Sequence, residues 1–401
     1  MTVSLLGLGT ACPPHCMTQQ EATQLFSDIV CEDERQRRLA KMLFRKAEVE
    51  TRYTVVPHKV AYNWCQDVSG TDQPPQPSDR AVPSQITPQV VPGQSHGPST
   101  RERMELFARF ASDLAVRSSE QALAQSGLQA QQITHLVVVT CTGFDAPGVD
   151  IDLIERLGLP RTTQRVQVGF MGCHAAINGL RTGLAIATAD TNARVLLCAV
   201  ELCSLHYRYT WDTEGIIGNA LFADGSGAVV IGQIDDIDYE PQSTTDPSLP
   251  TTCNWRLHDT GSVVIPDSRQ AMSWSIGNHG FDMRLTSDVG AKIEAELAGW
   301  LSDWLGRHGL RVADIDYWGV HPGGPRILDA VQNALKLPPA ALATSRSILK
   351  RHGNMSSPTV LFILNEFRQA RSVNSNTQRQ NCILLAFGPG LVAEIALLSV
   401  S

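Results

Sequence analysis

Three residues of types that carry out acyl transfer stand in glycine-rich, turn-like settings: Cys173, His321 and Asn354. Cys173 closes the segment Val168-Gly-Phe-Met-Gly-Cys173, in which a strand runs into a glycine turn and a helix follows. Free backbone N–H groups and the helix dipole at such a position favour the thiolate and lower the thiol pKa. A nucleophilic thiolate is therefore the preferred interpretation, and a buried thiol in a tightly packed Gly/Ala helix is the alternative.

His321 and Asn354 indicate catalysis only when they are considered together with Cys173. His321 follows a short apolar run and precedes Pro-Gly-Gly-Pro, where its ring could merely satisfy a turn. Asn354 is expected to begin a helix, where an N-cap is the ordinary explanation. As a Cys–His–Asn set, they predict an imidazolium that stabilises the thiolate and a pair of donors for a developing enolate or oxyanion.

Two stretches of the chain resemble each other and place this chemistry in matching contexts. Residues 126–135 align with residues 308–317, and Gly127 falls on Gly309 (309 − 127 = 182). Nearly the same offset carries Cys173 onto Asn354 (354 − 173 = 181). Because a repeat of this kind sets the architecture, we expect two duplicated halves that form one site where they meet.

The elements that must position these residues alternate between strand and helix, which predicts an α/β fold with helices packed on sheets. The expected halves are residues 1–235, which carry the Cys, and residues 236–401, which carry the His and the Asn. A stretch at 58–100, rich in Pro, Gln, Ser and Gly, is expected to be an irregular insertion. The expected strands are 3–9, 53–56, 136–139, 165–168, 195–200, 228–231, 317–320, 383–385 and 394–398, and the expected helices are 20–46, 101–124, 174–189, 290–309, 326–335 and 354–368.

Bulk properties exclude several classes of function. The net charge of −7 gives no basic footprint for nucleic acid. There is no apolar run of roughly 18 residues for a membrane span, and no secretory signal is visible. Ten scattered cysteines fit a reducing cytoplasm better than a disulfide framework. A metal site at Cys12-Pro-Pro-His15-Cys16 lacks a second ligand pair at the usual spacing, so no metal is expected.

Six segments carry a resemblance to a known family: Glu50-Thr-Arg-Tyr53, the Cys173 turn, Ala220-Leu-Phe-Ala-Asp-Gly225, His321-Pro-Gly-Gly-Pro325, Gly353-Asn-Met-Ser-Ser357 and Phe387-Gly-Pro-Gly390. Together they resemble the type III polyketide synthases, the chalcone-synthase-like branch of the thiolase superfamily. Cys141 resembles a cysteine found in bacterial members, which favours the bacterial type. The resemblance implies a five-layered αβαβα thiolase fold built from two duplicated halves, a homodimer, acyl-CoA and malonyl-CoA as substrates, and no cofactor.

The resemblance also implies roles for individual residues. Cys173 would hold the growing chain as a thioester, and His321 and Asn354 would bind the malonyl thioester carbonyl and stabilise the enolate. Lys46 would lie near the CoA phosphates, although a solvated surface lysine is the ordinary alternative. The remaining substrate-binding residues that the resemblance suggests are Phe222, Cys141, Thr142, Met283, Trp274 and Ser356 around the cavity, and Gly323 and Gly324 near the pantetheine arm.

The sequence therefore predicts a polyketide synthase that loads a starter acyl group on Cys173, extends it by decarboxylative Claisen condensation with malonyl-CoA, and cyclises the product. The rival enzyme is a ketoacyl-carrier-protein synthase III that condenses once with malonyl carrier protein. The non-enzymatic alternative is a catalytically silent protein that binds acyl-CoA. Ala386 replaces a glycine that is usual in the family, and Trp274 stands where a small residue is common. The indole predicts a short or compact product, whereas the starter and the number of extensions stay open.

Overall fold

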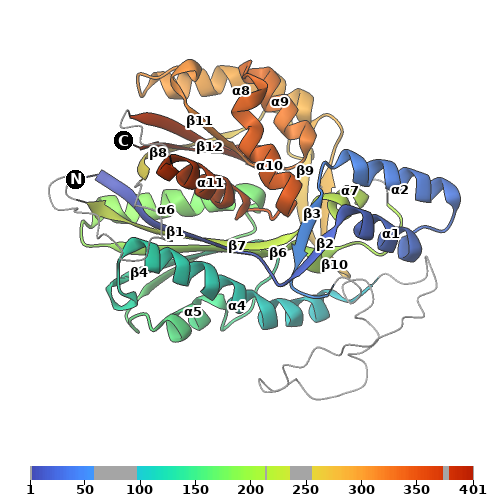
Figure 1. Cartoon of the computed structure of the whole chain (residues 1–401), viewed down its shortest axis with the longest axis horizontal. Coiled ribbons are helices and arrows are strands. Elements are labelled where there is room, and N and C mark those ends of the chain that lie inside the picture. Colours follow the sequence, from blue (N-terminus) through green and yellow to red (C-terminus); the bar gives the residue numbers. More distant parts are fainter. Residues whose placement is uncertain (1, 58–96, 213–214, 235–254, 374–378, 401) are drawn as a thin grey trace.

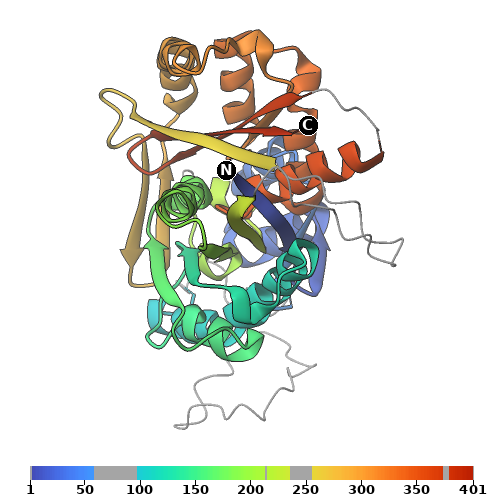
Figure 2. The same ribbon diagram turned by 90° about the vertical axis from the view of Figure 1, so that its left-hand side faces the viewer.

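The computed structural model describes residues 2–57, 97–212, 215–234, 255–373 and 379–400, and these residues form five layers (Figures 1 and 2). The strands join in the order β11-β12-β13-β8-β1-β7-β6-β4-β5. One half of this sheet consists of β1 (Thr2–Ala11), β7 (Asp224–Ile234), β6 (Arg194–Leu202), β4 (His135–Thr140) and β5 (Gln164–Gly169). The other half consists of β8 (Trp255–Val264), β13 (Val392–Val400), β12 (Gln380–Gly388) and β11 (Tyr317–Val320).

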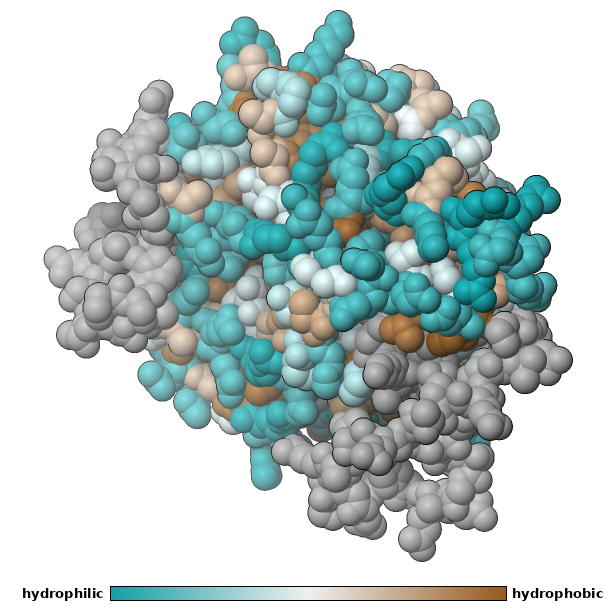
Figure 3. Space-filling view, turned by 45° about the vertical axis from the view of Figure 1, so that its right-hand side comes forward, coloured by the Kyte–Doolittle hydropathy of each residue, from teal (hydrophilic) through white to brown (hydrophobic). Residues whose placement is uncertain are grey.

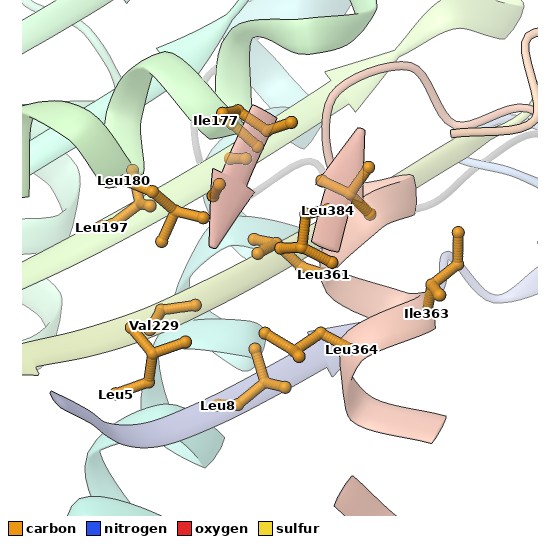
Figure 4. Packing of buried hydrophobic residues seen from close by; sticks show 14 of the residues in the cluster. Leu5, Leu8, Ile177, Leu180, Leu197, Val229, Leu361, Ile363, Leu364 and Leu384 are labelled. Carbon is orange, nitrogen blue, oxygen red and sulfur yellow. The ribbon is translucent and has the colours of Figure 1, made fainter. Parts of the chain in front are cut away.

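Helices occupy the middle and the two outer layers. Between the two halves of the sheet lie α6 (Ala175–Ala189) and α11 (Thr359–Val373). The first half is covered by α4 (Thr100–Ser126) and α5 (Val149–Leu157), and the second by α8 (Val289–Gly306) and α9 (Pro325–Leu335). Figure 4 shows the central core, in which Leu180 of α6 and Leu361 of α11 face strand residues of both halves. The layered thiolase fold expected from the resemblance is confirmed.

The duplication is visible in the backbone. Gly127 ends α4 with φ 69°, and Gly309, which follows the end of α8, has φ 68°. Short 3₁₀ turns follow at Ala130–Gln132 and Val312–Asp314, and then β4 and β11 begin 182 residues apart (317 − 135). A left-handed conformation suits glycine, because a Cβ would be strained there. The repeated glycine is therefore a chain-reversal point that both halves use.

A smaller group of elements caps one end of the layers. It contains β2 (His15–Thr18), α1 (Gln19–Val30), α2 (Glu34–Lys46), β3 (Thr51–Thr54), α7 (Ile216–Leu221) and α10 (Ala343–His352), together with the hairpin of β9 (Met272–Gly277) and β10 (Gly280–Leu285). Of these, α1, α2 and α7 share one apolar cluster. Among the described helices, none combines the length and the apolar character needed to cross a bilayer.

The structure corrects two expected helices. Residues 20–46 form two helices, because Asp33 caps α2 by accepting a hydrogen bond from the Gln36 N–H at 2.7 Å. Asn354 does not begin a helix: it forms an isolated bridge with Phe222, and α11 begins only at Thr359. The expected boundary at 235/236 and most of the expected insertion (58–96) lie outside the described residues.

Candidate active site

Cys173 opens onto a small cavity at the junction of the two halves. It lies in a 3₁₀ turn (Gly172–His174) that follows β5 and leads into α6. The cavity volume is about 30 Å³, far below the several hundred Å³ typical of ligand pockets. In this structure the cavity is therefore too small to hold an acyl chain. The cavity is lined by Cys141, Thr142, Gly172, Cys173, Cys203, Phe222, Met272, Ser273, Trp274, Met283, Ser356 and Pro389.

The turn before the thiol is held from both halves. Gly172 has φ 72°, and a Cβ there would meet Cδ of Pro389 at 2.2 Å. Its N–H donates to Cys141 Sγ at 3.0 Å. Pro389 belongs to the Gly-Pro-Gly turn between β12 and β13, whereas Cys141 follows β4. Only glycine fits this position, so the location of the thiol depends on contacts from both duplicated units.

Burial dominates the protonation of Cys173. It raises the pKa of the thiol to about 11, and the charge of Glu201 acts in the same direction. Hydrogen bonds from Ser356 and Asn354 lower the pKa but do not overcome burial. The Ser356 Oγ lies 3.6 Å from Cys173 Sγ. The expectation that the helix start lowers the thiol pKa is wrong for this state of the protein, because desolvation of a charge outweighs a partial helix dipole.

Asn354 is fixed by its own backbone rather than by a helix. Its N–H donates to the Leu221 carbonyl at 2.8 Å, and its carbonyl accepts from the Ala223 N–H at 2.9 Å. The side-chain Oδ1 accepts from the Ser356 N–H at 2.8 Å. Because a backbone N–H can only donate, the amide oxygen is assigned to that contact, and the NH₂ group is left to donate. That group is the donor that lowers the pKa of Cys173.

The imidazole ring of His321 makes no hydrogen bond to any residue that the structure describes. His321 lies just after β11, is 1% exposed, and donates its backbone N–H to the Leu385 carbonyl at 2.7 Å. Neither ring nitrogen has a hydrogen-bond partner among the described residues. Burial, and secondarily the charge of His174, lower its pKa to about 3. The ring is therefore neutral at pH 7, contrary to the imidazolium expected, and its one N–H is available to an incoming group.

Aromatic side chains form the wall opposite the thiol. Trp274 of β9 donates from Nε1 to the Cys141 carbonyl at 2.8 Å. Its ring meets that of Phe222 edge-on, with centroids 6.3 Å apart. Met283 pairs with Trp274 across the β9–β10 hairpin and also lines the cavity. Trp274, Phe222 and Met283, which the sequence analysis expected around the cavity, therefore all line it.

Three of the expected binding residues lie outside this cavity. Lys46 is exposed in the last turn of α2. Gly323 and Gly324 form the loop between His321 and α9, and a Cβ on Gly323 would lie 3.8 Å from the His321 ring. Gly323 and Gly324 therefore lie next to His321 in the chain, and none of the three residues lines the cavity around Cys173.

Sequence reasoning missed a buried carboxylate beneath the site. Glu201 of β6 is fully buried and accepts from the Cys141 N–H at 2.9 Å, the Thr142 hydroxyl at 2.7 Å and the Ser357 hydroxyl at 2.9 Å. Burial raises its pKa to about 7. It ties the end of β4 to the loop of Asn354. The available signal was an acidic residue inside the otherwise apolar run of residues 195–202.

His206 was also missed, and it supports the aromatic wall. Its Nε2–H donates to the Thr142 carbonyl at 2.6 Å, and its Nδ1 accepts from the Phe281 N–H at 3.0 Å. These two contacts fix a neutral tautomer, and burial lowers the pKa of the ring to about 3. The ring stacks on Phe281 at 4.2 Å and meets Trp274 edge-on. No motif marked this histidine in the sequence.

In the described part of the chain, no group of three or more His, Cys, Asp or Glu side chains lies close enough together to hold a metal ion. In the segment weighed as a metal site, Cys12 instead lies 3.5 Å from Nδ1 of His352. His352 stacks on Tyr53 with ring centroids 5.7 Å apart. That histidine therefore packs against β3 and is separate from the cavity.

Comparison with known families gives two matches. The N-terminal domain of chalcone and stilbene synthases matches residues 86–235, and the C-terminal domain of the same synthases matches residues 256–401. Cys173 falls within the first match, and His321 and Asn354 fall within the second.

Individual proteins agree with these matches. The chain is 32% identical over 295 residues to the alpha-pyrone synthesis polyketide synthase-like Pks18 of Mycobacterium tuberculosis, covering 73% of this chain and 72% of that protein. It is 27% identical to type III polyketide synthase A of Arabidopsis thaliana, covering 98% and 91% of the two chains. The crystal structure of PKS-I from the brown alga Ectocarpus siliculosus superposes with a TM-score of 0.84 at 28% identity, covering 100% and 98%.

The raised thiol pKa predicts how Cys173 reacts in the resting protein. With a pKa of about 11, its alkylation by iodoacetamide should speed up about tenfold per pH unit between pH 7 and pH 10, because only the thiolate reacts. Peptide mass spectrometry of Cys173 measures the rate separately from the exposed Cys16. Ser356→Ala should slow the reaction at each pH. A rate that is already maximal at pH 7 would contradict the neutral resting thiol.

Proposed function

The chain belongs to the chalcone and stilbene synthase family of type III polyketide synthases, and we propose that Cys173, His321 and Asn354 are its catalytic residues. Members of this family are acyltransferases that extend a starter acyl group by decarboxylative condensation with malonyl-CoA. The observation that supports the assignment of Asn354 is its side-chain hydrogen bond to the Cys173 thiol, which lowers the thiol pKa. His321 is supported by its buried imidazole, since neither ring nitrogen has a hydrogen-bond partner among the described residues.

In the proposed loading step, the Cys173 sulfur attacks the carbonyl carbon of the starter thioester. The new C–S bond to Cys173 forms, the C–S bond to CoA breaks, and the thiol proton ends on the departing CoA thiol. Because the Cys173 pKa is raised to about 11, the thiolate is formed during the reaction and is not stored beforehand. Donors that meet the oxyanion in a dry site stabilise this step most.

In the proposed extension step, the N–H of neutral His321 and the NH₂ of Asn354 donate to the thioester oxygen of malonyl-CoA. Loss of CO₂ leaves an enolate on that oxygen, and its carbon attacks the acyl group on Cys173. The Cys173–acyl bond breaks as the new C–C bond forms. A neutral imidazole is suited to this role because it offers one N–H to a developing negative charge.

The reacting groups of the proposed mechanism are the CoA thioesters themselves and Cys173, so we propose no further cofactor. Lys46 at the end of α2 would meet the CoA phosphates, and Gly323 and Gly324 would border the pantetheine arm on its way to His321. The eight cysteines of the described part are all free, which fits the reducing cytoplasm. Cys141, Thr142, Phe222, Met283 and Ser356 would shape the product, as lining residues of the cavity.

A homodimer is part of the proposal. The edge strand β5 is exposed along most of its length, and Val166 on it is 40% exposed. Three further apolar residues are partly exposed: Phe144 (48%), Phe170 (39%) and Met171 (39%). An open strand edge with exposed aromatics is normally covered, and a second copy of the chain offers the same surface by two-fold symmetry.

Substitution of the three proposed catalytic residues tests the mechanism. Cys173→Ala should abolish acyl loading and product. His321→Ala and Asn354→Ala should each slow malonyl-CoA decarboxylation by about a hundredfold or more, because each removes an oxyanion donor. Release of CO₂ from malonyl-CoA and the mass of the acyl-enzyme are the measurements. The same assay with malonyl carrier protein separates the synthase III alternative. Near-normal decarboxylation in both donor variants would remove them from the mechanism.

Trp274 should limit the size of the product. Trp274→Gly removes the indole from the cavity wall, so longer or more varied products are expected from a panel of starters, measured by mass spectrometry. Trp274→Phe, which keeps a ring, is the matched control. Pocket size discriminates by about 1–3 kcal/mol per methylene, so a shift in product ratio rather than a complete switch is expected. A stable Trp274→Gly protein with unchanged products would contradict the assignment.

The proposed dimer is tested on the edge strand. Val166→Glu should weaken self-association at least about tenfold, because a carboxylate would be buried without a partner. Sedimentation velocity over a range of concentrations measures it. Val264→Glu, at a position that is 64% exposed on β8, is the control and should leave the association unchanged. A wild-type chain that sediments as a monomer at micromolar concentration would overturn the proposal.

A further inference from the structure

Arg208 is a partly buried cation that the proposed mechanism does not use. Its side chain is 21% exposed, and Nη2 binds the Asp282 carboxylate of β10 at 2.8 Å while Nη1 binds the Asp212 carboxylate at 2.6 Å. The backbone N–H of Arg208 donates to the Asn219 side chain of α7 at 2.9 Å, and its carbonyl accepts from the same side chain at 2.8 Å. Arg208 therefore connects α7 with the β9–β10 hairpin.

The hairpin depends on side-chain contacts because it stands outside the main sheet (Figure 1). In the described part of the chain, β9 and β10 pair with each other and with no strand of the nine-stranded sheet. A two-stranded hairpin is at best marginally stable on its own in water. The polar contacts that hold β10 include the Phe281 N–H, which donates to His206 Nδ1 at 3.0 Å, and the Asp282–Arg208 ion pair. The ion pair therefore holds the residue immediately before Met283, which lines the cavity.

Met283 and Phe222 approach each other over one glycine of α7. A Cβ on Gly218 would lie 3.3 Å from the Phe222 ring and 3.9 Å from Met283 Cε. Phe222 directly follows α7, and Met283 pairs with Trp274 across the hairpin; all three line the cavity. The distance between α7 and β10 therefore sets how far Phe222 and Met283 stand apart, and Arg208 spans that distance.

Water reaches this ion pair from outside the cavity. The Asp282 side chain is 49% exposed. The side of the molecule that carries α2 and α7 comes forward in Figure 3, and most of its described surface is hydrophilic. Ion pairs at exposed positions are weak and are screened by salt. Loss of the pair is therefore expected to change how easily β10 moves, while the hairpin itself still forms.

We propose that Arg208 is a positioning residue that selects acyl groups by size, because its ion pair with Asp282 holds Met283 close to Phe222. Without the ion pair, β10 moves away from α7 more easily, and the cavity admits longer acyl chains. The proposal deepens the proposed function and rests on it, since the acyl group that is selected is the one loaded on Cys173.

The test measures which acyl-CoA starters the enzyme prefers. Straight-chain esters from acetyl-CoA to palmitoyl-CoA are offered with malonyl-CoA, and kcat/KM is compared for the longest and the shortest starter that the wild type accepts. Arg208→Met removes the cation and keeps an unbranched apolar chain, and Asp282→Ala removes the anion. Each should raise the ratio of long to short starter about three- to fivefold, as expected for the loss of an exposed ion pair. The combined variant should raise it no further, because either single change already breaks the same pair.

Four comparisons separate positioning from a general structural role. Arg208→Lys keeps a cation, so its ratio should lie nearer to that of the wild type than the ratio of Arg208→Met does. Arg284→Ala changes an exposed residue of the same strand and should leave the ratio unchanged. Salt at about 1 M should shift the wild-type ratio toward that of Arg208→Met, which itself should respond less. Release of CO₂ from malonyl-CoA should stay close to the wild-type rate in every variant.

The outcomes decide the proposal as follows. A raised ratio in both single variants, with no further rise in the combined variant and none in Arg284→Ala, supports it. An unchanged ratio in variants that melt like the wild type overturns it. An additive rise, or an equal rise in Arg284→Ala, would show general loosening of the hairpin and also overturns it. If Arg208→Met does not fold, the half-exposed Asp282→Ala decides by the same criteria. A wild type that loads no starter and releases no CO₂ would instead count against the proposed function.

Discussion

The position of one thiol depends on how closely the two halves of the fold approach each other. Gly172, next to Cys173, lies against Pro389 from the second half and donates to Cys141 from the first. Any Cβ at Gly172 would collide with the proline ring, so the turn has room only for glycine. Glu201 adds a polar connection between the same two halves. The duplication therefore does more than repeat a fold: the reactive sulfur lies where the two copies meet.

Desolvation is the main influence on the protonation states of Cys173 and His321. The same burial raises the pKa of Cys173 and lowers the pKa of His321, so both are neutral in the free protein. The His321 ring is buried and neither of its nitrogens has a hydrogen-bond partner among the described residues, which is costly, and this supports the proposal that a ligand oxygen binds there. In the proposed mechanism, the donors are therefore in place before the reaction and charge forms only during it, where preorganised groups contribute most.

The aromatic residues around the cavity hold one another in place. Trp274 is fixed by its hydrogen bond to the Cys141 carbonyl and by edge-on contacts with Phe222, His206 and Phe281. His206 in turn is held by hydrogen bonds on both of its nitrogens. A substitution at Trp274 therefore changes the contacts of several neighbouring rings, which the proposed selection of product size has to take into account.

The sequence by itself determined the family, the duplicated α/β plan and the residues around the thiol, because glycine turns, strand runs and short motifs are local signals that survive in the order of the chain. It did not determine protonation: a helix start suggested a thiolate, whereas burial by residues far away in sequence produces a neutral thiol. It also misjudged Asn354, whose place is set by a bridge to Phe222 and not by a helix cap. Glu201 and His206 escaped notice because their roles depend on partners about 60 to 156 positions away. Tertiary structure alone decides such properties, since desolvation and long-range hydrogen bonds depend on which segments come together in space.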